Sequence, residues 1–178
     1  MCDKVSRVIK ISLQKLKLGK KLQVRKIPNL SFGTKLRAKD GKLILGNVKT
    51  TGVCEFSAYS GLIEIGNGVS FNRNALIVSL MGIKIGDGCA FGPNVTIYDH
   101  NHKFDENGIA PGYTKSVVEI GKNCWIGAGS IILKNAKIGD GCVIGAGCVI
   151  NEEIPPHSLV TSGRGITITP IVGKKESK

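Results

Sequence analysis

The sequence predicts an all-β chain wound into a triangular coil, and three observations support this fold class. Glycine is abundant, with 24 residues among 178, and it separates short Ile/Val segments. A period of six fits neither the helix period of 3.6 nor the strand period of 2, but it fits one short strand followed by one sharp turn. Three such units close one coil. The period itself is carried by a regular series of isoleucines: Ile120, Ile126, Ile132, Ile138, Ile144 and Ile150.

The fifth place of each repeat holds a small side chain until the series ends at Ile154. This place lies where the wall of the coil turns, so only a small residue fits. Six cysteines in a chain without a secretory signal are expected to be free thiols. We therefore interpret the cysteines of the repeat as small buried residues and expect no metal site. The small residues are Cys124, Ser130, Ala136, Cys142 and Cys148.

The first residues predict a different element, a short basic amphipathic helix over 3–18. Nine of the first 26 residues are Lys or Arg, and only Asp3 is acidic. One role for such a helix is to cap the open first coil. The alternative is peripheral contact with an anionic membrane surface. We assign 1–41 to this helix and a capping segment. The apolar residues at helical spacing are Val5, Val8, Ile9, Leu13 and Leu16.

The repeat continues upstream in rougher form, with Leu45, Ile65 and Ile85 spaced 20 residues apart and each followed by glycine. The gap from Ile97 to Ile120 is 23 residues where 18 would close a coil. This surplus of five predicts an excursion loop over about 98–118. We therefore predict a β-helix of about five coils over 42–163. It ends near the proline pair at 155–156, because proline lacks the amide donor that a sheet needs. A C-terminal strand (166–172) and tail would fill 164–178.

Composition and charge limit the partners. The chain is 42% hydrophobic and contains no apolar run of membrane-span length, so we expect one cytoplasmic domain, with contact at the membrane surface left open. The net charge of +12 favours anionic partners. Aromatic residues make up only 5%, and no nucleic-acid-binding motif is present, so we expect no nucleic acid.

Four stretches together resemble a known family: "FGPNVTI" (91–97), "IGKNCWIGAGS" (120–130), "IGDGCVIGAGCVI" (138–150) and "IPPHSLV" (154–160). They resemble the hexapeptide-repeat acyltransferases, and within them the sugar O-acetyltransferases of galactoside, maltose and surface-polysaccharide type. The resemblance implies a left-handed parallel β-helix and acetyl-CoA as acyl donor, with a longer acyl group left open. It also implies a homotrimer with active sites between subunits. The acceptor would be a small-molecule or lipid-linked sugar, such as a precursor in polysaccharide biosynthesis.

In the resembled family a loop histidine is the catalytic base, and "YDHNHKFDENG" (98–108) offers two candidates. Trp125 follows His100 by 25 residues and His102 by 23, and both spacings fit the family. The order His-x-apolar-Asp in "HKFD" favours His102, while His100 remains the alternative. Imidazole, with a pKa near ~6.5, can take a proton from a sugar hydroxyl at neutral pH. Asp99 is the nearest candidate to orient the ring.

The resemblance also implies binding residues. Asn72 matches a position that contacts the sugar in galactoside enzymes, and Asn74 lies two places further. The acidic residue expected eight places after Asn72 is replaced by Leu80, so a simple galactoside is not the expected acceptor. The family often carries a Gly-x-Pro-Ala-Lys/Arg stretch after the proline pair, for the cofactor phosphates, and this chain departs from it with "SGRG" (162–165). Arg164 is the expected substitute, and Lys174 and Lys175 are alternatives. The other residues expected to contact the cofactor are Trp125, Gly127, Ala128, Gly145 and Ala146.

Two other functions fit the same fold. A γ-type carbonic anhydrase binds zinc through three histidines, and this chain has only His100, His102 and His157. The spacing of the first two is tighter than that family uses. A non-catalytic scaffold would keep the prism as an assembly surface. The sequence leaves the acceptor sugar open.

Overall fold

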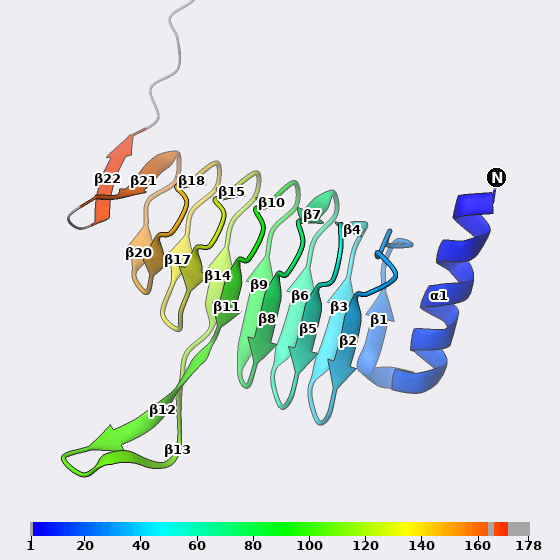
Figure 1. Ribbon diagram of the computed structural model, residues 1–178, viewed down its shortest axis with the longest axis horizontal. Helices are drawn as coiled ribbons and strands as arrows, with labels where there is room; N and C mark the ends of the chain where they lie inside the picture. Colours follow the sequence, from blue (N-terminus) through cyan, green and yellow to red (C-terminus); the bar gives the residue numbers. More distant parts are fainter. Residues whose placement is uncertain (1, 164–165, 171–178) are drawn as a thin grey trace, which may run out of the picture.

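The computed structural model describes residues 2–163 and 166–170, which form one helix and a prism of stacked strands (Figure 1). Three walls of mostly parallel strands enclose the prism. The first wall contains β1 (Leu22–Val24), β3 (Lys42–Leu45), β6 (Leu62–Ile65), β9 (Gly82–Ile85), β14 (Val118–Ile120), β17 (Lys137–Ile138) and β20 (Glu153–Ile154). The third contains β2 (Lys35–Ala38), β5 (Glu55–Ala58), β8 (Leu76–Ser79), β11 (Thr96–Tyr98), β16 (Ile131–Ile132) and β19 (Val149–Ile150).

The second wall ends in the only antiparallel pair within the described part of the prism walls. There β22 pairs antiparallel with β21, and the predicted C-terminal strand corresponds to β22 as far as residue 170. Residues 171 and 172 of that prediction, like Arg164, Lys174 and Lys175, lie outside the described residues. The strands of this wall are β4 (Val48–Thr50), β7 (Val69–Phe71), β10 (Ala90–Phe91), β15 (Trp125–Ile126), β18 (Val143–Ile144), β21 (Ser158–Ser162) and β22 (Ile166–Pro170).

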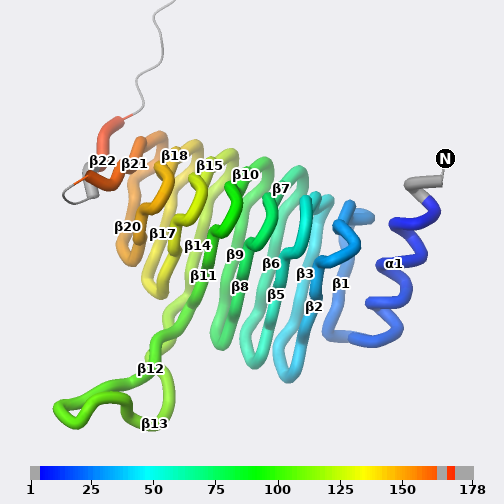
Figure 2. The backbone as a smooth tube through the Cα atoms, in the orientation of Figure 1, coloured from blue at the N-terminus to red at the C-terminus, as the bar shows by residue number. Residues whose placement is uncertain are grey.

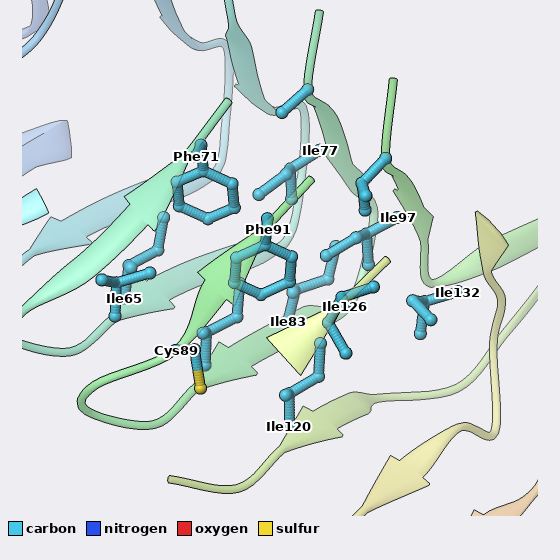
Figure 3. Close-up of a cluster of buried hydrophobic side chains, with 14 of the residues drawn as sticks. Ile65, Phe71, Ile77, Ile83, Cys89, Phe91, Ile97, Ile120, Ile126 and Ile132 are labelled. Carbon is cyan, nitrogen blue, oxygen red and sulfur yellow. The ribbon is translucent and has the colours of Figure 1, made fainter. Parts of the chain in front are cut away.

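The interior is built by ladders of the repeated apolar residues (Figure 3). Ile126 lies opposite Ile144 on the next strand, and Ile132 lies opposite Ile150. After each 18 residues, an isoleucine therefore stacks on another isoleucine. Phe71 and Phe91 stack in the same way with ring centroids 4.4 Å apart. The period-six prediction is confirmed because the six isoleucines from 120 to 150 are all buried. The five cysteines with described side chains are buried and free: Cys54, Cys89, Cys124, Cys142 and Cys148.

The described chain makes five complete coils, from β3 to β19, and a partial coil at each end. The expected count of about five therefore fits the complete coils but understates the solenoid, which makes about seven turns. The extra turn at the start arises because β1 and β2 already belong to the walls. Leu22 pairs with Leu43, and Lys35 pairs with Glu55.

A helix and a hairpin depart from the prism (Figure 2). Helix α1 (Cys2–Leu18), continued by the short 3-10 turn η1 (Gly19–Lys21), lies across the end where the coils begin. The antiparallel hairpin of β12 (His100–Asp105) and β13 (Gly108–Lys115) projects from the prism between β11 and β14. Among the described helices, none has the length and apolar character needed to cross a membrane.

The surplus of five residues expected from the sequence is wrong. That calculation treated Ile97 and Ile120 as stacked, but the structure pairs Ile120 with Ile85 on the first wall and Ile97 with Ile132 on the third. Ile85 and Ile120 are 35 residues apart, whereas Ile65 and Ile85 are 20 apart. The surplus over one coil is therefore 15 residues, the difference between 35 and 20, rather than five, and the hairpin at 100–115 lies within the predicted range of about 98–118.

Candidate active site

The root of the hairpin is built around Asp99, a carboxylate with no exposed surface. Its Oδ2 accepts hydrogen bonds from the Ser79 hydroxyl at 2.7 Å and from the amides of Met81 and Gly82 at 2.8 and 2.7 Å. Its Oδ1 accepts the amide of Leu80 at 2.9 Å. All these donors lie at residues 79–82, where β8 ends and β9 begins, one coil earlier. Asp99 thus fixes the start of the hairpin to the preceding coil.

The same contacts determine the ionisation of Asp99. Burial disfavours the charged form, but the amides and hydroxyl of the 79–82 turn, together with His100, favour it. Their sum holds the pKa of Asp99 below its ordinary value. Asp99 is therefore a carboxylate at neutral pH, and it can only accept hydrogen bonds.

His100 is oriented by this carboxylate. Its Nδ1 lies 2.9 Å from Asp99 Oδ1, so Nδ1 carries the proton and donates it, leaving Nε2 as an acceptor in the neutral ring. The ring is edge-on to Tyr98 and Tyr113, with centroid distances of 5.7 and 5.4 Å. Only 14% of its side chain is exposed. Asp99, the residue predicted to orient the base, therefore contacts His100, which was the alternative candidate, and not His102.

His102 lies further along β12 and is exposed. It pairs across the hairpin with Tyr113, whose ring centroid is 4.7 Å from that of the imidazole. Sequence reasoning missed Tyr113, which contacts both histidines. Only the register of the hairpin reveals it, because His102 and Tyr113 are 11 residues apart in a segment without periodicity.

Two predicted binding residues share a cleft on the second wall. The cleft has a volume of about 330 Å³ and includes Asn72, Gly92 and Trp125 in its lining. Trp125 is 57% exposed and projects from β15. The Oδ1 of Asn72 accepts hydrogen bonds from Thr51 Oγ1 at 3.1 Å and from the Arg73 amide at 2.8 Å. The geometry therefore joins one acceptor-side candidate with one cofactor-side candidate.

Asn74 lies next to this cleft in sequence, but a structural role accounts for it. Its φ of 62° is in the left-handed region, which asparagine tolerates in turns. Its Nδ2 donates to Asn94 Oδ1, 3.1 Å away in the next coil. The two side chains continue the stacking of the coils along the turn.

The small residues predicted to contact the cofactor stack along the turn that follows the second wall. Gly127 lies above Gly145, since Ile126 pairs with Ile144. A Cβ at Gly127 would lie 2.5 Å from the amide nitrogen of Ala146, so the close approach of coils requires glycine there whether or not a ligand binds. Ala128 and Ala146 are exposed beside it. The turn presents a smooth surface of small side chains below Trp125.

A larger groove of about 650 Å³ runs along the first wall and was not predicted. Its outward residues alternate in charge from strand to strand, and opposite charges on facing residues favour the pairing of neighbouring strands. Each stands directly before a buried isoleucine of the repeat, so the period itself could have located them. In order along the wall they are Glu64, Lys84, Glu119, Lys137 and Glu153.

The third histidine lies apart from the hairpin. His157 occupies the turn after β20, where its amide donates to the Asp140 carbonyl at 2.8 Å. Within the described residues, no three side chains of His, Cys, Asp or Glu are grouped as a metal site requires.

Comparison with known proteins agrees with the repeat. Residues 118–152 match the family model described as bacterial transferase hexapeptide (six repeats). The chain is 42% identical over 103 residues to nodulation protein L of Rhizobium meliloti strain 1021, covering 57% of this chain and 56% of that protein. It is 34% identical over 112 residues to galactoside O-acetyltransferase of Escherichia coli K12, covering 61% of this chain and 53% of that protein.

The hexapeptide-repeat architecture also matches solved structures. A maltose O-acetyltransferase from Clostridium difficile 630 superposes with a TM-score of 0.65 and 25% identity, covering 92% of this chain and 76% of that one. The chain spans about half the length of the curated relatives it matches.

Proposed function

We propose that this protein is an acyltransferase that moves an acetyl group from acetyl-CoA to a hydroxyl or amino group of a sugar. The observation that carries the proposal is the cleft that Asn72 and Trp125 line together on a hexapeptide-repeat prism. Galactoside and maltose O-acetyltransferases are among the proteins that it resembles. A precursor of a surface polysaccharide is the acceptor that we favour, and the cytoplasm, where acetyl-CoA is available, is the expected location.

The donor would bind along the second wall. Trp125 offers an exposed aromatic face for the pantetheine arm, and Ala128 and Ala146 keep the path below it free of bulk. The cofactor phosphates are anionic, and the net charge of +12 favours their approach. We retain Arg164 as a candidate partner for those phosphates. The acceptor would lie against Asn72, whose carboxamide is held in place by Thr51 and Arg73.

We assign the general base to His102. Its imidazole is exposed on the projecting hairpin, where a sugar can reach it, whereas His100 is packed between Tyr98 and Tyr113. His102 would accept the hydroxyl proton as the sugar oxygen attacks the thioester carbonyl carbon. The C–S bond then breaks as the tetrahedral intermediate collapses, and the imidazolium returns the proton to the thiolate of CoA. The Asp99–His100 pair would position the hairpin.

We further propose a homotrimer in which the hairpin of one subunit faces the cleft of the next. The hairpin tip exposes Phe104 and Ile109, at 83% and 75% of their surface, as expected for residues that a neighbour covers. The third wall also presents a pair of apolar outward residues, since Ile131 lies opposite Val149 and both are exposed. In a trimer these surfaces would be buried, and His102 would act on a donor held by the adjacent chain.

The test is release of free CoA from acetyl-CoA by the full-length protein with a panel of sugars. We expect His102→Ala to lower kcat/KM at least ~100-fold, the usual effect of losing a general base. His157→Ala is the matched control, because it removes a histidine from a turn outside the site, and it should keep wild-type activity. If His100→Ala is inactive and His102→Ala is active, the base is His100. Absence of CoA release with every sugar would support the scaffold function instead.

A further inference from the structure

The outward face of α1 carries a stripe of exposed apolar side chains. Val5, Ile9, Leu13 and Leu16 follow one another at spacings of four, four and three residues, which places them on one side of a helix, and Val8 lies at its edge. All five remain exposed: Val5 58%, Val8 40%, Ile9 56%, Leu13 62% and Leu16 84%. A surface helix normally buries such a stripe against the core. Here the prism leaves it uncovered.

The opposite face holds the helix on the prism. Ile11 is buried and joins the hydrophobic core, and α1 contacts β1 and β2. The Nζ of Lys10 donates to the carbonyls of Leu30 and Ser31, which fixes the helix to the segment between those strands. Because the inner face is occupied by these contacts and the stripe is exposed, the stripe lies on the side of α1 away from the coils. The helix itself lies at the end of the prism where the coils begin (Figure 1).

The charge around the stripe indicates what covers it. At 100° per residue, Lys15 and Lys17 fall on the two opposite edges of the stripe, and both are exposed. Two copies packed through this face would bring their lysines together with few acids to pair them, since Asp3 is the only acidic residue among the first 26. An anionic surface has the complementary charge. Apolar residues flanked by lysines are the pattern of helices that lie in a lipid headgroup layer.

We propose that α1 docks the protein onto an anionic phospholipid bilayer, with the stripe of Val5, Val8, Ile9, Leu13 and Leu16 in the headgroup region and Lys15 and Lys17 at the lipid phosphates. The prism then extends away from the membrane, with its coils and hairpin in water. This role is independent of the proposed acyl transfer, because α1 lies at the opposite end of the walls from β21 and on a different face from the hairpin.

The test is co-sedimentation of the full chain with vesicles of phosphatidylcholine containing about one third phosphatidylserine, with pure phosphatidylcholine as the reference. Wild type should bind the anionic vesicles at least ~10-fold more tightly, since each lysine near an anionic surface contributes roughly fivefold. Leu13→Glu combined with Leu16→Glu should weaken that binding at least ~100-fold, because two leucines leave the apolar layer. Lys122→Glu is the control. It changes the net charge by the same two units, but at an exposed residue of a distant coil, and it should bind the anionic vesicles like wild type.

The proposal would be overturned if the wild type showed no preference for anionic vesicles, or if the double glutamate variant bound them as tightly as wild type. It would also be overturned if light scattering showed that this variant had lost oligomeric mass, because the stripe would then contact a second copy. If the double variant fails to fold, as judged by circular dichroism, Lys15→Glu with Lys17→Glu replaces it. That pair leaves the apolar residues intact and should also abolish the anionic preference; unchanged binding would refute the electrostatic contact.

Discussion

Asp99 provides the sharpest test of how the hairpin is anchored. In Asp99→Asn the side chain keeps its size but loses its charge, and its amide group meets donors where an acceptor is needed. The Gly82 amide and the Ser79 hydroxyl are buried donors to Oδ2. The Leu80 and Met81 amides are only partly buried, so water can replace their partner. Counting the two buried donors at about 1.5–3 kcal/mol each for hydrogen bonds to a charged group, we expect the free energy of unfolding to fall by about 3–6 kcal/mol.

The assay is urea unfolding followed by circular dichroism at fixed protein concentration. Asp140→Asn is the matched control: Asp140 is exposed and its Oδ1 accepts the Lys122 amide at 2.6 Å, so its loss should cost below about 1 kcal/mol. The prediction also has a pH signature. Because the folded pKa of Asp99 is lowered, its contribution is fully present above the unfolded value of ~3.9 and is lost as pH falls through the folded pKa. The difference in the free energy of unfolding between wild type and Asp99→Asn should therefore become smaller below about pH 4. Equal stability of the two asparagine variants, or a gap that does not change with pH, would refute this account.

Three further predictions concern the core, the cleft and the hairpin tip. Ile132→Ala should lower the free energy of unfolding by about 2–5 kcal/mol because it opens a cavity in the prism, whereas Ile131→Ala, on the outward side of the same strand, should cost below about 1 kcal/mol in the same urea assay. Trp125→Ala should raise the KM for acetyl-CoA at least ~10-fold in the CoA-release assay without changing the melting temperature, because its side chain projects outward; an unchanged KM would remove it from the donor site. Phe104→Ser with Ile109→Ser should shift the mass in light scattering from trimer to monomer, and a trimer that persists would show that the tip is not an interface.

The periodic part of the fold could be predicted because one rule governs it. Each interior position repeats its own chemistry, so the six isoleucines located the walls without any knowledge of long-range contacts. The first turn escaped prediction because β1 and β2 are separated by ten residues that follow no such period. The left-handed winding of the β-helix was predicted from the family resemblance alone, because connections between parallel strands are in general right-handed.

The site was predicted less completely, for reasons of geometry. The histidines were recognised from local sequence, but Asp99 receives its donors from residues 79–82, which are brought to it only by the stacking of one coil on the next. Tyr113 depends on the register of an irregular hairpin. The amphipathic pattern of α1 was evident, but a helical wheel does not say which face the prism will cover. The structure covers the face of Ile11 and leaves the longer apolar stripe outside.

The hairpin leaves the prism and returns to it at one closed point. The Ser116 amide donates to the Asp99 carbonyl at 3.0 Å, and two residues later Val118 resumes the first wall opposite Ile83. Residues 100–115 are therefore an interchangeable cassette, whose length and composition can change without altering the register of any wall, since lengthening a closed loop costs little. Segments of other length that keep His100 and His102 could be grafted between Asp99 and Ser116 without moving a wall strand, so that one prism can carry hairpins of different shape.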